Sequence, residues 1–167
     1  MKSIDIALIN SHSPYEVWTN NGRDFFFLTD TGHLFIVSFE DDRSIWETAC
    51  YQLIITNEDG SPSPNDRKLR DTIFQIIAGF FAANPDILLY ICDTEDGRQA
   101  LRSRLFLRWF HMYAEVEHYY MCTAEMVYRN GIANYAAIIV QSSNPQLKEI
   151  AAEFNRVVGL LKSKPAH

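Results

Sequence analysis

The sequence predicts an α+β fold in which a twisted, mostly antiparallel sheet of six to seven strands carries three packed helices. Short runs rich in Phe, Val, Ile and Thr alternate with glycine-containing turns between residues 15 and 56, which is typical of an antiparallel meander. A continuous apolar run at 87–92 separates two helical patterns, and Asn130-Gly131 lies between two further apolar runs. The expected order is four strands, helix, strand, helix, two strands and helix.

Length and composition favour one domain over residues 1–167. The chain is 47% hydrophobic and 13% aromatic, which argues against disorder. Its net charge of −6 argues against broad binding to nucleic acid or to an anionic membrane, so we expect neither partner. Three cysteines, Cys50, Cys92 and Cys122, are far apart in apolar runs, and no secretory or membrane-spanning stretch is seen, which predicts reduced thiols and a cytoplasmic location.

The N-terminal half is expected to hold most of the strands. Residues 1–14 are interpreted as a leader or an edge strand, and residues 15–56 as the antiparallel meander. Phe25, Phe26 and Phe27 are consecutive, so their strand is expected to be covered on both faces or to contribute to an interface. The expected strands are Tyr15–Thr19, Asp24–Thr29, His33–Phe39 and Cys50–Thr56.

Residues 63–162 are expected to form helix, strand, helix, hairpin and helix. Ser63 as N-cap with Pro64 and Asp66 behind it predicts the first helix start. A two-residue turn at Asn130-Gly131 would place Cys122 opposite Ile139 in the hairpin. The last helix is expected to begin after Ser143.

The stretch from Tyr90 to Phe110 combines an apolar strand, an acidic turn and an arginine-rich helix. Asp93 is the expected N-cap of this helix. Its core-facing stripe is expected to comprise Leu101, Leu105, Trp109 and Met112. Arg98 and Arg102 fall on the same stripe, whereas Arg104 and Arg108 fall on a solvated flank.

Two interpretations of the cluster Asp93, Asp96, Arg98 and Arg102 stay open. The first is a structural ion-pair network that holds the helix to the end of the preceding strand. The second is an anion site, because two guanidinium groups one turn apart near a helix N-terminus can bind a phosphate or carboxylate. A small anionic ligand is therefore an alternative to a purely structural role.

Most of the chain, including DRKLRDTI at 66–73 and YICDTEDGRQALRSRLFLRWF at 90–110, resembles a family of small uncharacterised proteins from bacteria of the Bacteroides group, and this resemblance implies no activity. From Cys50 onward the order of elements is similar to the core of the GNAT acyltransferases. That superfamily cradles coenzyme A with a glycine-rich loop, but residues 62–70 contain no glycine. Coenzyme A is accordingly expected only under the alternative of an atypical acyltransferase.

No pattern specifies a catalytic centre or a metal site. His111 is expected on a helix, and His118 and Cys122 would lie ~13 Å apart along a strand. Whether the protein is an enzyme stays undecided, and no cofactor is expected. The sequence favours a non-enzymatic binding or assembly module, expected to be a homodimer that uses an aromatic surface at Phe25–Phe27 or Tyr119-Tyr120. The alternative is an anion-binding enzyme, and weak nucleic-acid binding through Arg102, Arg104 and Arg108 is disfavoured by the acidic charge.

Overall fold

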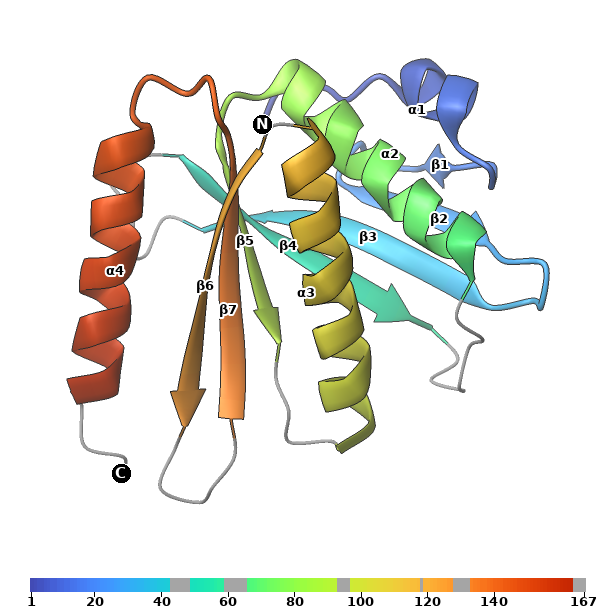
Figure 1. The fold of residues 1–167 in the computed structure, drawn as a ribbon. Coiled ribbons are helices and arrows are strands. Elements are labelled where there is room, and N and C mark those ends of the chain that lie inside the picture. The colour runs from blue at the N-terminus through green and yellow to red at the C-terminus, as the bar shows by residue number, and fades with distance from the viewer. Residues whose placement is uncertain (43–48, 59–65, 93–96, 118, 128–132, 164–167) are drawn as a thin grey trace. The chain divides into compact units, whose positions relative to one another are not determined.

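The computed structural model describes residues 1–42, 49–58, 66–92, 97–117, 119–127 and 133–163 (Figure 1). Seven strands form a mixed, mostly antiparallel open sheet in the order β1-β2-β3-β4-β5-β7-β6, and the described residues also form four helices, which confirms the α+β class. The elements are α1 (Ile6–His12), β1 (Trp18–Thr19), β2 (Asp24–Leu28), β3 (Leu34–Asp41), β4 (Cys50–Asn57), α2 (Arg67–Ala83), β5 (Ile87–Cys92), α3 (Gly97–Glu117), β6 (Tyr119–Val127), β7 (Ala133–Gln141) and α4 (Leu147–Ser163).

The chain divides into two compact units. The first contains Met1–Glu40 and Leu53–Pro85, and the second contains Asp41–Gln52 and Asp86–His167. Each unit has its own buried apolar residues. The single domain expected from the chain length stays a prediction.

The N-terminal segment of the first unit forms helix α1, so the edge strand predicted as one alternative for residues 1–14 is wrong, whereas the leader predicted as the other alternative stays a prediction. The Asp5 side chain accepts hydrogen bonds from the backbone N–H groups of Ala7 and Leu8, at 3.0 and 3.2 Å. These bonds satisfy donors that a helix start otherwise leaves open. Ile9 on this helix is buried, and a Cβ added to Gly79 of α2 would lie 2.8 Å from its Cγ1 atom. The two helices can approach this closely because α2 has a glycine at this position.

The first predicted strand is shortened to β1, Trp18–Thr19. The side chain of Asn10 bonds both the backbone N–H and the backbone C=O of Val17, each at 2.8 Å. The backbone N–H of Tyr15 donates instead to the hydroxyl of Thr72, at 3.3 Å. Side chains of α1 and α2 therefore form hydrogen bonds with backbone groups that would otherwise pair with a neighbouring strand of the sheet.

The meander of β1, β2 and β3 has one buried face and one outer face. Phe25 pairs with Val37, and Phe27 pairs with Phe35, whose ring lies 5.6 Å away, centroid to centroid. All four side chains are buried, and α2 lies across this face (Figure 1). Phe26, between two buried phenylalanines, points to the opposite face because side chains alternate along a strand.

Helix α2 begins at Arg67 and uses Asp66 as its N-cap, so the predicted start with Ser63 as N-cap and Asp66 inside the helix is wrong; Ser63 itself lies outside the described residues. Asp66 accepts from the backbone N–H of Lys68 at 2.8 Å. The apolar stripe predicted for this helix is confirmed as buried: Leu69, Ile73, Ile76, Ile77 and Phe80.

In the second unit, β6 and β7 form the predicted hairpin in a different register. Cys122 lies opposite Ile138 rather than Ile139, and the last pair is Val127 with Ala133. Five residues, 128–132, therefore connect the paired strands, and a two-residue turn is incompatible with this register. One face of β5, β6 and β7 packs on α4 in a core cluster of Cys50, Ile87, Leu89, Ile138, Val140, Ile150 and Phe154.

Helix α3 packs on the other face of these strands. The ring of Tyr90 on β5 lies 6.4 Å from that of Phe106 and 5.3 Å from that of Phe110. The predicted core stripe is wrong in part: Trp109 is buried, but Met112 is 50% exposed and Phe110 is fully buried. Apolar side chains surround most of this helix, so their spacing did not determine which side faces the sheet.

Candidate functional site

The charged cluster predicted from the sequence lies largely outside the residues that the structure describes. Asp93 and Asp96 precede α3 in an undescribed segment. Arg98 and Arg102 belong to α3, but their side chains are also outside the described part. The ion-pair and anion-site interpretations of this cluster both stay predictions.

The other two arginines of α3 are exposed, as predicted. An Nη atom of Arg104 donates to the phenol oxygen of Tyr135 at 3.4 Å, and its guanidinium carbon lies 5.9 Å from the ring centroid. The Tyr135 hydroxyl in turn donates to Glu125 at 3.3 Å. Long bonds at the surface contribute little to stability, so Arg104 is a solvated side chain lying over an aromatic ring.

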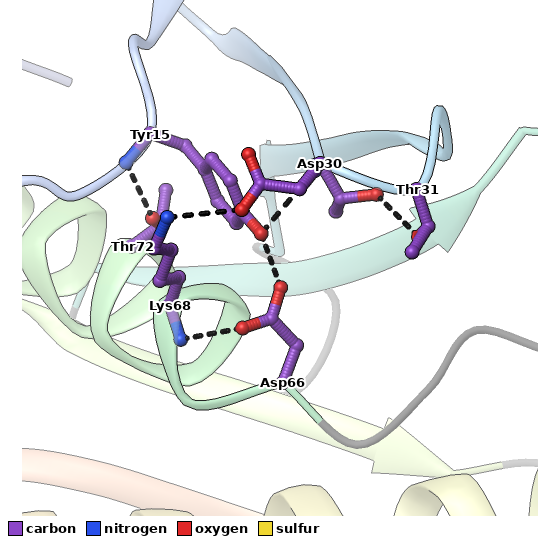
Figure 2. Close-up of polar contacts among 7 residues, drawn as sticks. Tyr15, Asp30, Thr31, Asp66, Lys68 and Thr72 are labelled. Carbon is purple, nitrogen blue, oxygen red and sulfur yellow. Dashed lines mark hydrogen bonds and ion pairs between the residues drawn. The ribbon is translucent and has the colours of Figure 1, made fainter.

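A polar cluster that sequence reasoning missed surrounds Tyr15 in the first unit (Figure 2). The Tyr15 hydroxyl donates to one carboxylate oxygen of Asp66, whose other oxygen caps α2. The same hydroxyl accepts from the backbone N–H of Asp30 at 3.3 Å. Lys68 donates to the Asp30 carboxylate at 2.9 Å, and its ammonium group lies 5.7 Å from the Tyr15 ring centroid. The cluster thus joins three segments that are distant in the sequence.

Burial and charge keep this phenol protonated. Tyr15 is 6% exposed, and burial together with the hydrogen bond to Asp66 raises its pKa to about 12. Lys68 has a raised pKa because its ammonium group is bonded to the carboxylate of Asp30, although its side chain is 54% exposed. A neutral phenol keeps its proton, donates a hydrogen bond to its neighbour and is a poor base.

The bonding pattern gives the Tyr15 cluster a structural role. The phenol, the two carboxylates and the ammonium group all bond one another or the backbone, and Tyr15 also bonds buried Thr72 through its own N–H. A catalytic acid or base needs a group directed at a substrate. The sequence signal for this cluster was weak, since Tyr15, Asp30 and Asp66 lie in three separate connecting segments and share no motif.

Apolar side chains with partial or full exposure lie on the outer face of the meander in the first unit. Trp18 pairs with Phe26 and stacks on it, with ring centroids 5.9 Å apart. Phe26 pairs with Ile36, and Leu28 pairs with Leu34 on the same face. We call these five residues the meander patch. Trp18 is 41% and Leu28 53% exposed, and the other three are half-buried.

The edge of the meander patch is polar. Asp24 pairs with Ser38 at the end of the strands farthest from Leu28. The hydrogen bonds from Ser38 and Asn21 hold the pKa of Asp24 below its usual range. An apolar centre beside a polar edge is the arrangement found in protein interfaces. The interface at Phe25–Phe27 stays a prediction, and of these three residues only Phe26 lies on the outer face, because Phe25 and Phe27 are buried.

Among the described residues, no three His, Cys, Asp or Glu side chains gather in a way that could hold a metal ion. Within the same ranges, no helix combines the length and the hydropathy needed to span a bilayer. Cys50 is buried, Cys122 is half-buried, and both are free thiols.

These features define an α+β protein with a mixed open sheet, an internally bonded polar cluster and an exposed apolar sheet face. Residues 65–156, more than half of the chain, match a family of unknown function, DUF6169, and the chain belongs to this family. No curated protein matches the chain. The family carries no assigned activity, so a function has to be argued from the residues.

Proposed function

We propose that the protein is a non-enzymatic assembly module that forms a homodimer through the meander patch. The observation that carries the proposal is the contiguous exposed surface of Trp18, Phe26, Leu28, Leu34 and Ile36. Contiguous apolar patches on soluble domains mark interaction sites more often than isolated exposed residues do. The Tyr15 cluster is engaged in hydrogen bonds within the first unit and supplies no competing catalytic centre.

A second copy of the chain is the occupant that the apolar composition of the patch favours. Two copies that each carry a net charge of −6 repel each other, so a contact between them has to be apolar enough to offset this repulsion. None of the five patch residues is charged, and Asp24, which precedes Phe26 on the same face of β2, is bonded to Asn21 and Ser38. Two identical apolar sheet faces can pack about 10 Å apart around a two-fold axis, with each patch covering the other.

The proposal includes a bacterial, cytoplasmic setting with neither nucleic acid nor a membrane as partner. Free thiols at Cys50 and Cys122 support a reducing compartment. The acidic net charge supports the exclusion of polyanionic partners.

Sedimentation of Leu28→Glu against a matched control tests the dimer. Leu28 and Leu8 are both exposed leucines, 53% and 45%, but Leu8 lies on α1 and outside the meander patch. We expect the wild type and Leu8→Glu to self-associate at micromolar concentration, whereas a buried charge in Leu28→Glu weakens the association through the meander patch at least about 30-fold, since an unpaired charge at an interface costs about 2 kcal/mol or more. Equal association of Leu28→Glu and the wild type, at equal thermal stability, would show that the patch is not the interface.

A further inference from the structure

Strand β6 is a long strand that ends the order of the described sheet. It is nine residues long, Tyr119–Val127, and all nine pair with β7 in one uninterrupted register. The strand at the opposite end of the sheet order, β1, has two residues. Natural edge strands are commonly kept short or interrupted by proline, lysine or a bulge. Residues 119–127 contain no proline, lysine, arginine or glycine, and Glu125 is their only charge.

Helices of its own unit contact both faces of β6, while Thr123 and Glu125 on the α3 side are exposed. The Tyr119 ring stacks on Tyr113 of α3, with centroids 5.4 Å apart. Cys122 and Ala124, on the opposite face, pack against the core cluster that includes Ile150 of α4. Within the described ranges, β6 has a paired strand only on the β7 side, so about half of its residues direct backbone N–H and C=O groups away from β7. Tyr119, Cys122 and Ala124 are packed, and among the described strands none lies along the outer backbone edge of β6.

We propose that β6 pairs antiparallel with β6 of a second copy, on a two-fold axis through Thr123. Thr123 is the central residue of the strand and is exposed. In this register Glu125 of one copy lies opposite Met121 of the other, so the only charged residue of the strand does not face itself. Like charges directly opposite each other destabilise strand pairs, and this register avoids that cost. A sheet that continues across two copies satisfies the open backbone groups of both edges.

The β6 contact extends the proposed assembly function, because the meander patch and the β6 edge are different surfaces. A protomer with two self-complementary contacts forms either a closed tetramer or an open chain of dimers. Each contact can be removed separately, so the inference about β6 and the proposed function have separate tests.

Two single variants and their double variant separate the contacts. Leu28→Glu disrupts the meander patch, and Thr123→Lys places two ammonium groups opposite each other on the β6 axis. Thr123→Val is the matched control, since valine keeps the strand preference and adds no charge. In sedimentation we expect species larger than a dimer for the wild type and for Thr123→Val, a dimer for each charged single variant, and a monomer for the double variant.

The outcomes identify which contact fails. A monomeric Leu28→Glu beside a dimeric Thr123→Lys and a dimeric wild type would overturn the β6 contact and leave the meander dimer standing. The reverse pattern, in which only Thr123→Lys is monomeric, would remove the meander dimer and support β6 pairing.

Hydrogen exchange supplies a second measure. In Leu28→Glu, the amides of residues 119–127 should exchange at least about 10-fold more slowly at high than at low protein concentration, and this protection should disappear in the double variant. Exchange of this strand that does not depend on concentration contradicts the proposal.

Discussion

The phenol of Tyr15 donates a hydrogen bond to the carboxylate of Asp66, the residue that caps α2. The pair joins the segment before β1 to a helix start 51 residues later in the chain. The capping bond to Lys68 N–H uses the other carboxylate oxygen, so one side chain holds both the helix and the preceding segment. The carboxylate of Asp66 therefore joins the start of α2 to the segment before β1.

Replacement of Tyr15 by phenylalanine should lower the free energy of unfolding by about 1–2 kcal/mol. The variant keeps the ring that stacks on Phe27, with centroids 6.0 Å apart, but removes the donor to Asp66. Tyr135→Phe is the control, because its hydroxyl makes only longer bonds of 3.3 and 3.4 Å near the surface and should cost less than about 0.5 kcal/mol. Urea unfolding of both variants measures the difference, and equal losses would assign no special role to the Tyr15 pair.

The contribution of Tyr15 should also depend on pH in the alkaline range. The pKa of Tyr15 is raised from 10.0 to about 12 by burial and by the bond to Asp66, so folding favours the protonated phenol. This contribution is fully present below pH 10 and is lost as the pH rises from 10 through 12. The stability advantage of the wild type over Tyr15→Phe should therefore shrink between pH 9.5 and pH 11.5, in urea titrations at about these two values. An advantage that stays constant would contradict the raised pKa.

Much of the fold could be predicted because the hydrophobic pattern specifies most strands and helices. Strand β5 has the predicted bounds, and the buried stripe of α2 consists of the residues its period indicates. The errors occur where a side chain replaces a backbone partner. Asp5 starts a helix in a segment expected to be a leader or an edge strand, and Asn10 binds the backbone of Val17, which was expected to pair in the sheet.

The candidate site was less predictable than the fold, since its residues meet only in three dimensions. Phe25, Phe26 and Phe27 are identical residues, and only the alternation of the folded strand separates the half-buried Phe26 from its fully buried neighbours. The hairpin register was predicted one residue away from the observed one, because a favourable Asn-Gly pair was assigned the shortest turn. No feature of the sequence around Tyr15 or Asp66 indicates that these two residues are hydrogen-bond partners.

Two glycine-to-alanine substitutions should have opposite effects on stability. A Cβ at position 79 would lie 2.8 Å from Cγ1 of Ile9 and 3.2 Å from Cγ2 of Ile4, so Gly79→Ala forces α1 away from α2 and should cost about 1–2 kcal/mol. Gly159 lies in α4 with no atom within 4 Å of an added Cβ, and Gly159→Ala should gain about 0.5–1 kcal/mol from helix propensity. Thermal unfolding of the two variants should show a lower melting temperature for Gly79→Ala and a higher one for Gly159→Ala, each relative to the wild type. A stabilised Gly79→Ala would show that the approach of α1 to α2 is looser than described.

The thiols of Cys50 and Cys122 should differ strongly in reactivity. Burial raises the pKa of Cys50 to about 12, with further contributions from the carboxylates of Asp42 and Asp86. At pH 8 only about one Cys50 in 10⁴ is a thiolate, whereas Cys122 is half-buried. In a Cys92→Ser background, a disulfide reagent should therefore label Cys122 at least about 100-fold faster, as followed by the mass of the labelled peptides. In 6 M guanidinium chloride both should react at similar rates, which is the control that the difference arises from the fold.

The two interpretations of Arg98 and Arg102 make opposite predictions for Arg98→Ala/Arg102→Ala. An anion site predicts that phosphate, a small carboxylate or coenzyme A raises the melting temperature of the wild type by several degrees, and that the double variant loses this shift while folding normally. A structural ion-pair network predicts no ligand shift and a variant that melts well below the wild type, because unpaired acids remain. Thermal shift assays with each ligand decide between them, with Arg104→Ala as the exposed control from the same helix. A ligand shift kept by the double variant would place anion binding elsewhere in the chain. A normal melting temperature without any ligand shift would remove both roles and leave these arginines as solvated side chains.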